Sequence, residues 1–127
     1  MENFRDFEVG PDPFNRMWRA QFKYLQTGIS IRHSDSVDVR YVLSTEGEQA
    51  QKTVVIGNAD IRAYNARTNR PVSDAWCSRI AMCKLIDSIE TAEGLDKDYL
   101  QVSAAEISEF DARIRKWEEE WPRKHAA

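Results

Sequence analysis

Hydrophobic residues recur in this sequence with two different spacings, one typical of strands and one typical of helices. No other feature constrains its fold as strongly. Between residues 29 and 43 apolar side chains alternate with polar ones, as on a half-buried strand, whereas from residue 73 to residue 121 they recur at helical spacing. Strands that precede the longest helices are typical of the α+β class. We therefore expect an α+β fold: an antiparallel sheet of three or four strands with a buried central helix, and an amphipathic C-terminal helix that covers a remaining face.

The strand signal is clearest at 29–43, which we interpret as a hairpin with a three-residue turn at Ser34-Asp35-Ser36. That turn length keeps one face of the hairpin apolar. The cross-strand pairs it predicts are Ile31 with Val39, Ile29 with Tyr41, and Arg32 with Asp38. The polar residues 44–51 then predict a loop, the β-branched run at 52–57 an interior strand, and 99–102 a further short strand.

A short helix is expected within 58–70, ending before Asn69-Arg70-Pro71, and longer helices are expected at 73–93 and from 104 to about 121. In the second of these, Ser73 is a suitable N-cap, the wide apolar stripe indicates burial on most sides, and Gly94 is a suitable stop. The last helix begins with the capping box of Ser103 and Glu106. Pro122 is expected to end it.

Residues 13–26 carry two conflicting patterns. Asp12 followed by Pro13 is typical of a helix start, and apolar side chains then follow at helical spacing until Gly28. However, Trp18 begins a stretch in which apolar and polar residues alternate as they do on a strand. We favour a helix over 13–26, and we expect residues 1–11 to form an irregular N-terminal arm or a short edge strand.

Length and charge favour one soluble domain over residues 1–127. The chain has 127 residues, enough for a self-sufficient core, and a net charge of −3, which is unlike a non-specific nucleic-acid binder. Its acidic N-terminus does not resemble a secretion signal, and its apolar runs are too short to span a bilayer. Cys77 and Cys83 lie too far apart on one helix to pair, so we expect reduced thiols and a cytoplasmic protein.

Catalytic and metal-binding patterns are weak in this sequence. A serine or cysteine nucleophile would need His33, because His125 lies at the chain end, and His33 fits a packed histidine better than a catalytic one. Metal-ligand spacing and phosphate-binding glycine loops are both missing from the sequence. We therefore expect no metal and no cofactor; nothing in the sequence supports an enzyme assignment, and an enzyme is the last of the alternatives.

Two segments have the composition of a binding surface. Basic and aromatic residues interleave at Arg16, Trp18, Arg19 and Lys23, as they do in single-stranded nucleic-acid binders. The C-terminal helix carries the stripe of Phe110, Ile114, Trp117 and Trp121, and tryptophan is enriched where proteins meet. We prefer a non-enzymatic protein-interaction or accessory-subunit domain that uses this stripe to hold a protein partner or a second copy. A nucleic-acid-binding module and a small-ligand pocket between sheet and helix are the alternatives.

Overall fold

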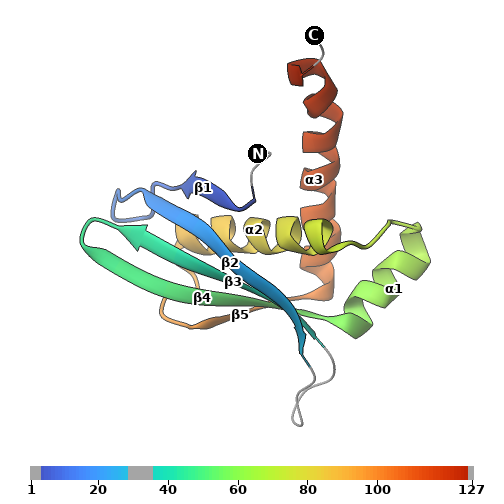
Figure 1. Ribbon diagram of the computed structural model, residues 1–127, viewed down its shortest axis with the longest axis horizontal. Helices are drawn as coiled ribbons and strands as arrows, with labels where there is room; N and C mark the ends of the chain where they lie inside the picture. Colours follow the sequence, from blue (N-terminus) through green and yellow to red (C-terminus); the bar gives the residue numbers. More distant parts are fainter. Residues whose placement is uncertain (1–3, 29–35, 126–127) are drawn as a thin grey trace.

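The computed structural model describes residues 4–28 and 36–125, with side chains up to residue 119 (Figure 1). Its elements, in chain order, are β1 (Asp6–Val9), β2 (Trp18–Gly28), β3 (Ser36–Thr45), β4 (Glu48–Gly57), α1 (Asn58–Thr68), α2 (Asp74–Thr91), β5 (Tyr99–Val102) and α3 (Ala104–His125). The α+β class is confirmed.

The sheet has five strands, and they lie side by side in the order of the sequence. Strands β1 to β4 are antiparallel neighbours, whereas β5 runs parallel to β4. The chain between β4 and β5 contains α1 and α2, and a parallel pair requires such a long connection. The expectation of three or four antiparallel strands was therefore wrong in strand number and in the direction of β5.

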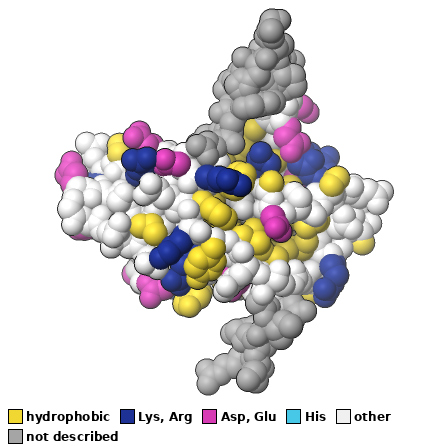
Figure 2. Space-filling view, viewed as in Figure 1, with side chains coloured by type: hydrophobic (Ala, Val, Ile, Leu, Met, Phe, Trp, Pro, Cys, Tyr) yellow, Lys and Arg dark blue, Asp and Glu magenta, His cyan; other side chains and the backbone are white. Residues whose placement is uncertain are grey.

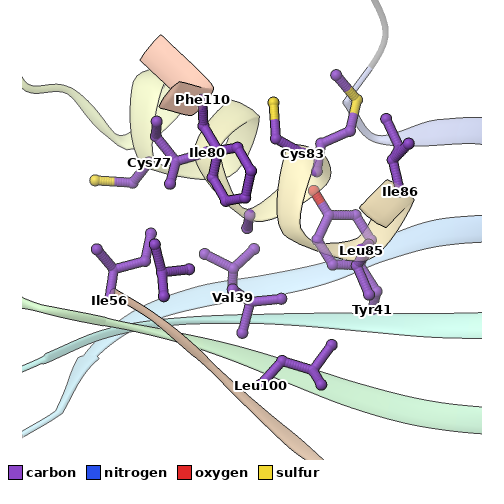
Figure 3. Packing of buried hydrophobic residues seen from close by; sticks show 14 of the residues in the cluster. Val39, Tyr41, Ile56, Cys77, Ile80, Cys83, Leu85, Ile86, Leu100 and Phe110 are labelled. Atoms are coloured by element: carbon purple, nitrogen blue, oxygen red, sulfur yellow. The ribbon is translucent and has the colours of Figure 1, made fainter. Parts of the chain in front are cut away.

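Helix α2 packs on one face of the sheet, which we call the inner face. Its apolar side chains meet those of the strands, including Val39 on β3 and Ile56 on β4, which face Ile80 of α2 in Figure 3. Helix α3 packs mainly on α2 and α1 rather than on the sheet. The expectation that the C-terminal helix covers a remaining face was therefore wrong. Among the described residues no helix lies over the second face, which we call the open face.

Residues 18–28 form strand β2, so the prediction of a helix over 13–26 was wrong. The alternating pattern decides the structure there, because it places Trp18 and Ala20 in the core while Arg19 and Gln21 lie on the other side. Strand β2 is held on both sides, by β1 and by β3. Residues 1–11 include the edge strand β1, as one of the two interpretations of that segment proposed.

The predicted hairpin register was also wrong. Val39 pairs with Leu25, and Tyr41 pairs with Phe22, across a bulge between Phe22 and Tyr24. Asp38 lies opposite Gln26. The predicted partners at 29–33 and the turn at 34–36, except for Ser36, lie outside the described residues.

The expected loop over 44–51 is shorter in the structure. β3 and β4 pair as far as Thr45 with Glu48, around a tight turn that contains Gly47 with a φ of 71°. Glycine adopts this left-handed conformation without steric cost, which permits the two-residue connection. The predicted strand at 52–57 is therefore the second half of a longer strand.

After residue 57 the helix signals were reliable, in contrast to the helix-start signal at Asp12 and Pro13. The side chain of Ser73 caps α2 by accepting a hydrogen bond from the Trp76 N–H at 3.1 Å, and α1 occupies most of the expected range. Ala92 rather than Gly94 is the left-handed residue directly after α2. Helix α3 begins at the predicted capping box but continues past Pro122 to His125.

Candidate interaction surfaces

The stripe on α3 is divided between the core and the surface. Ile107, Phe110 and Ile114 are fully buried, and Phe110 points toward the cluster around Ile80 in Figure 3. Trp117 is only partly buried and packs against the edge of the same core. Figure 1 shows the C-terminal turns of α3 rising past the sheet and α2. The side chain of Trp121, one turn beyond Trp117, lies outside the described side chains.

The start of α3 is fixed by the capping box that the sequence indicates. The Ser103 N–H donates to Glu106 Oε1 at 3.0 Å, and the Glu106 N–H donates to Ser103 Oγ at 3.2 Å. Glu106 also receives two hydrogen bonds from Lys84 of α2. These contacts join the first turn of α3 to α2 and so set the direction in which α3 leaves the body of the protein.

The basic and aromatic residues at 16–23 do not share one surface. Trp18 is buried on the inner face, whereas Arg19 lies on the open face and forms an ion pair with Asp6 at 2.7 Å. Arg16 bonds to Asp12 at 2.9 Å and to Glu48 at 3.2 Å. Lys23 is exposed. Two of the three basic groups are thus neutralised by carboxylates, which is unfavourable for a phosphate-binding surface.

A rigid turn at residues 10–17 is organised around the buried carboxylate of Asp12. This carboxylate accepts hydrogen bonds from the backbone N–H groups of Phe14 and Arg16, from Arg16 Nε and from Trp18 Nε1, all at 2.9 Å. Burial alone would raise the pKa of Asp12, but these hydrogen bonds outweigh it and lower the pKa to about 2. The turn presents Phe14 and Met17 to solvent, with 71% and 52% of their surface exposed.

A second buried carboxylate, Asp111, joins the three helices. It accepts from Tyr64 Oη at 2.5 Å, from Trp76 Nε1 at 2.8 Å, and from Nε of Arg70 and of Arg115 at 3.0 Å. Burial opposes its ionisation, but these donors more than compensate and lower the pKa of its carboxyl. Asp111 and Arg115 are four residues apart, a spacing at which ion pairs usually lie on the exposed side of a helix. The pair forms, but Asp111 has no exposed side-chain surface.

Sequence reasoning missed this cluster because its members are far apart in the chain. The available signal was the pair Tyr64 and Trp76, since the polar atoms of these aromatic residues need partners when they are buried. Asp111 directly follows the buried Phe110 in the sequence, and it therefore lies at the edge of the apolar stripe of α3.

Lys52 was also missed as a buried charge. It lies on the inner face, and its Nζ donates to the backbone carbonyls of Leu95 and, at 2.6 Å, Lys97. Burial lowers its pKa, although the nearby charges of Asp98 and Asp96 oppose the shift. Because its ammonium group is held by two carbonyls of the segment before β5, Lys52 fastens that segment to the sheet and is not presented to a ligand.

A groove of about 700 Å³ lies between the end of α2, β5 and the start of α3. Three of its charged side chains are already in ion pairs: Lys84 with Glu106 at 2.8 Å, and Asp87 with Arg113 at 2.8 Å; Glu93 and Lys97 also line it. A small ligand would have to compete with these ion pairs. The groove is therefore weak support for the small-ligand alternative.

The open face carries an unusual set of side chains, which no sequence pattern indicated. The strand register puts all five glutamines of the chain on this face: Gln21, Gln26, Gln49, Gln51 and Gln101. One row across four strands consists of Tyr24, Arg40, Thr53 and Tyr99. Figure 2 shows one side of the molecule, where hydrophobic side chains gather over the middle and basic and acidic side chains lie scattered among them and toward both ends.

Arg40 occupies the centre of the open face, on the middle strand of the sheet. Its guanidinium donates to Thr53 Oγ1 at 3.0 Å and to Gln51 Oε1 at 2.8 Å, and it lies 5.9 Å from the centre of the Tyr24 ring. Tyr99, at the other end of the row, is 62% exposed. The face is therefore a preorganised polar surface with an aromatic ring at each end of one row.

The thiols lie in the core. Burial raises the pKa of Cys77 to about 11 and that of Cys83 to about 12, so both remain protonated near neutral pH. Both cysteines are free, in agreement with the expectation of reduced thiols. His33 lies outside the described residues, and the side chain of His125 lies outside the described side chains.

Among the described residues, no three or more His, Cys, Asp or Glu side chains are grouped so that they could hold a metal ion. None of the helices in the described part of the chain combines the length and the apolar character that crossing a membrane requires.

Comparison of the chain with protein-family models, with curated proteins and with solved structures finds no match in any of the three.

Proposed function

We propose that this chain is a protein-interaction or accessory-subunit domain whose C-terminal helix holds a partner protein or a second copy of the chain. The observation that carries the proposal is the division of the α3 stripe. Phe110 and Ile114 are buried inside the domain, Trp117 lies at the edge of the core, and α3 continues past it. Trp121 continues the same stripe one turn further along the helix.

The anchoring of α3 supports this role. Arg70, between α1 and α2, donates to Glu118 at 2.7 Å, and Arg113 forms a two-pronged contact with Asp87 of α2. A helix that is fixed at its base loses little conformational freedom on binding, which favours affinity. In the proposal, Phe110 and Ile114 position the helix, while Trp117 and Trp121 bind the partner.

The test is replacement of both tryptophans by alanine. If they form the centre of an interface, Trp117→Ala/Trp121→Ala should weaken association by at least about 2 kcal/mol, or roughly 30-fold. Sedimentation velocity over a range of concentrations measures self-association. Pull-down followed by mass spectrometry identifies proteins held by the wild type, and the purified partner is then titrated against both forms.

Lys116→Ala is the matched control, because Lys116 is exposed on the same turn of α3. Circular dichroism checks that each variant is folded. Unchanged association of the folded double variant would contradict the proposal, and so would an equal loss in Lys116→Ala. Trp121→Ala alone separates binding from packing, because Trp117 then remains in place against the core.

A further inference from the structure

The side chains of the open face share one chemical property: most are uncharged and can both donate and accept hydrogen bonds. A glutamine amide carries two donors and an acceptor with two lone pairs, and threonine and tyrosine hydroxyls do both as well. All five glutamines of the chain contribute to this face. Such a surface matches a ligand whose own groups are hydroxyls, since each hydroxyl also donates and accepts.

The two tyrosines of the open face lie at opposite ends of one row that runs across the strands. Tyr24 on β2 and Tyr99 on β5 are in register through Arg40 and Thr53, three strand spacings apart, which is about 14 Å. Tyr24 is 36% exposed and Tyr99 is 62% exposed, so both rings are accessible to a ligand. A chain of several sugar rings laid across the strands would reach from one tyrosine to the other.

Charge distinguishes between the polymers that could lie there. In the paired rows at the centre of the face, the charged residues of β2 to β5 are Asp38 and Arg40, whose charges cancel, and Lys23 lies in the bulge beside Tyr24 as one further positive charge. A nucleic acid requires an excess of positive charge. The centre of a protein interface is richer in apolar surface than this face, whose aliphatic side chains, Val42 and Val55, are already half-buried.

We propose that the open face binds a neutral oligosaccharide strand that crosses from Tyr24 to Tyr99. The tyrosine rings pack against the apolar faces of sugar rings, and Gln51, Gln26 and Gln101 bond to their hydroxyls. Arg40, already held by Thr53 and Gln51, offers its remaining donors at the centre. At its β5 edge this surface adjoins the first turn of α3, where Glu106 lines one groove with Tyr99 and Gln101, but the proposal does not depend on Trp117 or Trp121, which lie further along that helix.

The glutamines provide a direct readout. Neutral hexasaccharides built of glucose, mannose, xylose or galactose are titrated into ¹⁵N-labelled protein, and the glutamine side-chain NH₂ signals are followed. At least one hexasaccharide should shift the signals of Gln26, Gln51 and Gln101. Tyr99→Ala should raise the dissociation constant about tenfold through loss of the ring contact.

Phe14→Ala is the matched control, because Phe14 is an equally exposed aromatic residue that lies off this face. It should leave the dissociation constant unchanged. The proposal is overturned if none of the four hexasaccharides shifts the glutamine signals, or if Phe14→Ala weakens binding as much as Tyr99→Ala. It is also overturned if an oligothymidylate shifts those signals with a salt-sensitive affinity while the sugars do not.

Discussion

Asp12 and Asp111 are both carboxylates with no exposed side-chain surface, yet they hold together very different lengths of chain. The donors to Asp12 come from Phe14, Arg16 and Trp18, so the whole cluster closes within six residues. The donors to Asp111 come from three helices and the segment between two of them, the most remote being 47 residues away. Loss of the first carboxylate should loosen one turn, whereas loss of the second should loosen the packing of all three helices.

The largest effect is expected from Asp111→Asn. The amide cannot balance the charge of Arg70, whose side chain is only 15% exposed, or that of the more exposed Arg115, and breaking a buried ion pair on one side costs about 3–5 kcal/mol. Chemical denaturation measures the free energy of unfolding. Glu109→Gln, an exposed change on the same helix, is the control and should alter stability by less than about 0.5 kcal/mol. Equal stability of the two variants would show that the cluster does not hold the helices together.

A smaller effect is expected from Tyr64→Phe. This change removes one hydrogen bond to Asp111 but leaves the ring, which stacks on Trp76 at 6.0 Å between ring centres. Hydrogen bonds to charged groups contribute about 1.5–3 kcal/mol. The loss should become much smaller in the Asp111→Asn background, and a double-mutant cycle measures that coupling. Additive losses would mean that Tyr64 acts independently of the carboxylate.

The smallest and most local effect is expected at Asp12, and pH can reveal it without mutation. Its carboxylate contributes stability above its ordinary pKa of 3.8, and that contribution is lost as the pH falls through the folded value of about 2. The indole N–H signal of Trp18 should therefore stay in place on acidification and move with a midpoint near 2. The Trp76 indole, bonded to Asp111, should change only together with the rest of the core. A Trp18 midpoint near 3.8 would contradict the role given to the turn.

The same comparison explains how much of the molecule could be predicted. Asp12 accepts hydrogen bonds from backbone N–H groups of the following residues, as a helix N-cap would. A turn follows it instead of the predicted helix, because aspartate caps turns in the same way as it caps helices. The helix start at Ser103 was predictable because all its contacts are local. The partners of Asp111 could not be predicted, because no local sequence pattern indicates which distant donors will lie next to a buried carboxylate.

The two proposed binding surfaces differ in the same way. Trp117 and Trp121 attracted notice because they continue a helical stripe, and the structure shows how α3 uses Phe110 and Ile114. The side-chain composition of the open face could not be predicted from the sequence. Its glutamines are scattered between residues 21 and 101, and only the register of β2, β3, β4 and β5 brings them together.

The position of α2 in the chain has a consequence for biosynthesis. The four antiparallel strands are complete at Gly57, but the helix that covers their inner face ends only at Thr91. At roughly 5–20 residues per second, the ribosome needs about 2–7 s to add those 34 residues. During that interval the emerging chain carries an uncovered apolar layer, with Val39, Leu43 and Val54 still facing water. The nascent protein is therefore most vulnerable to aggregation, and most in need of a chaperone, after its sheet sequence has been made and before its second helix is finished.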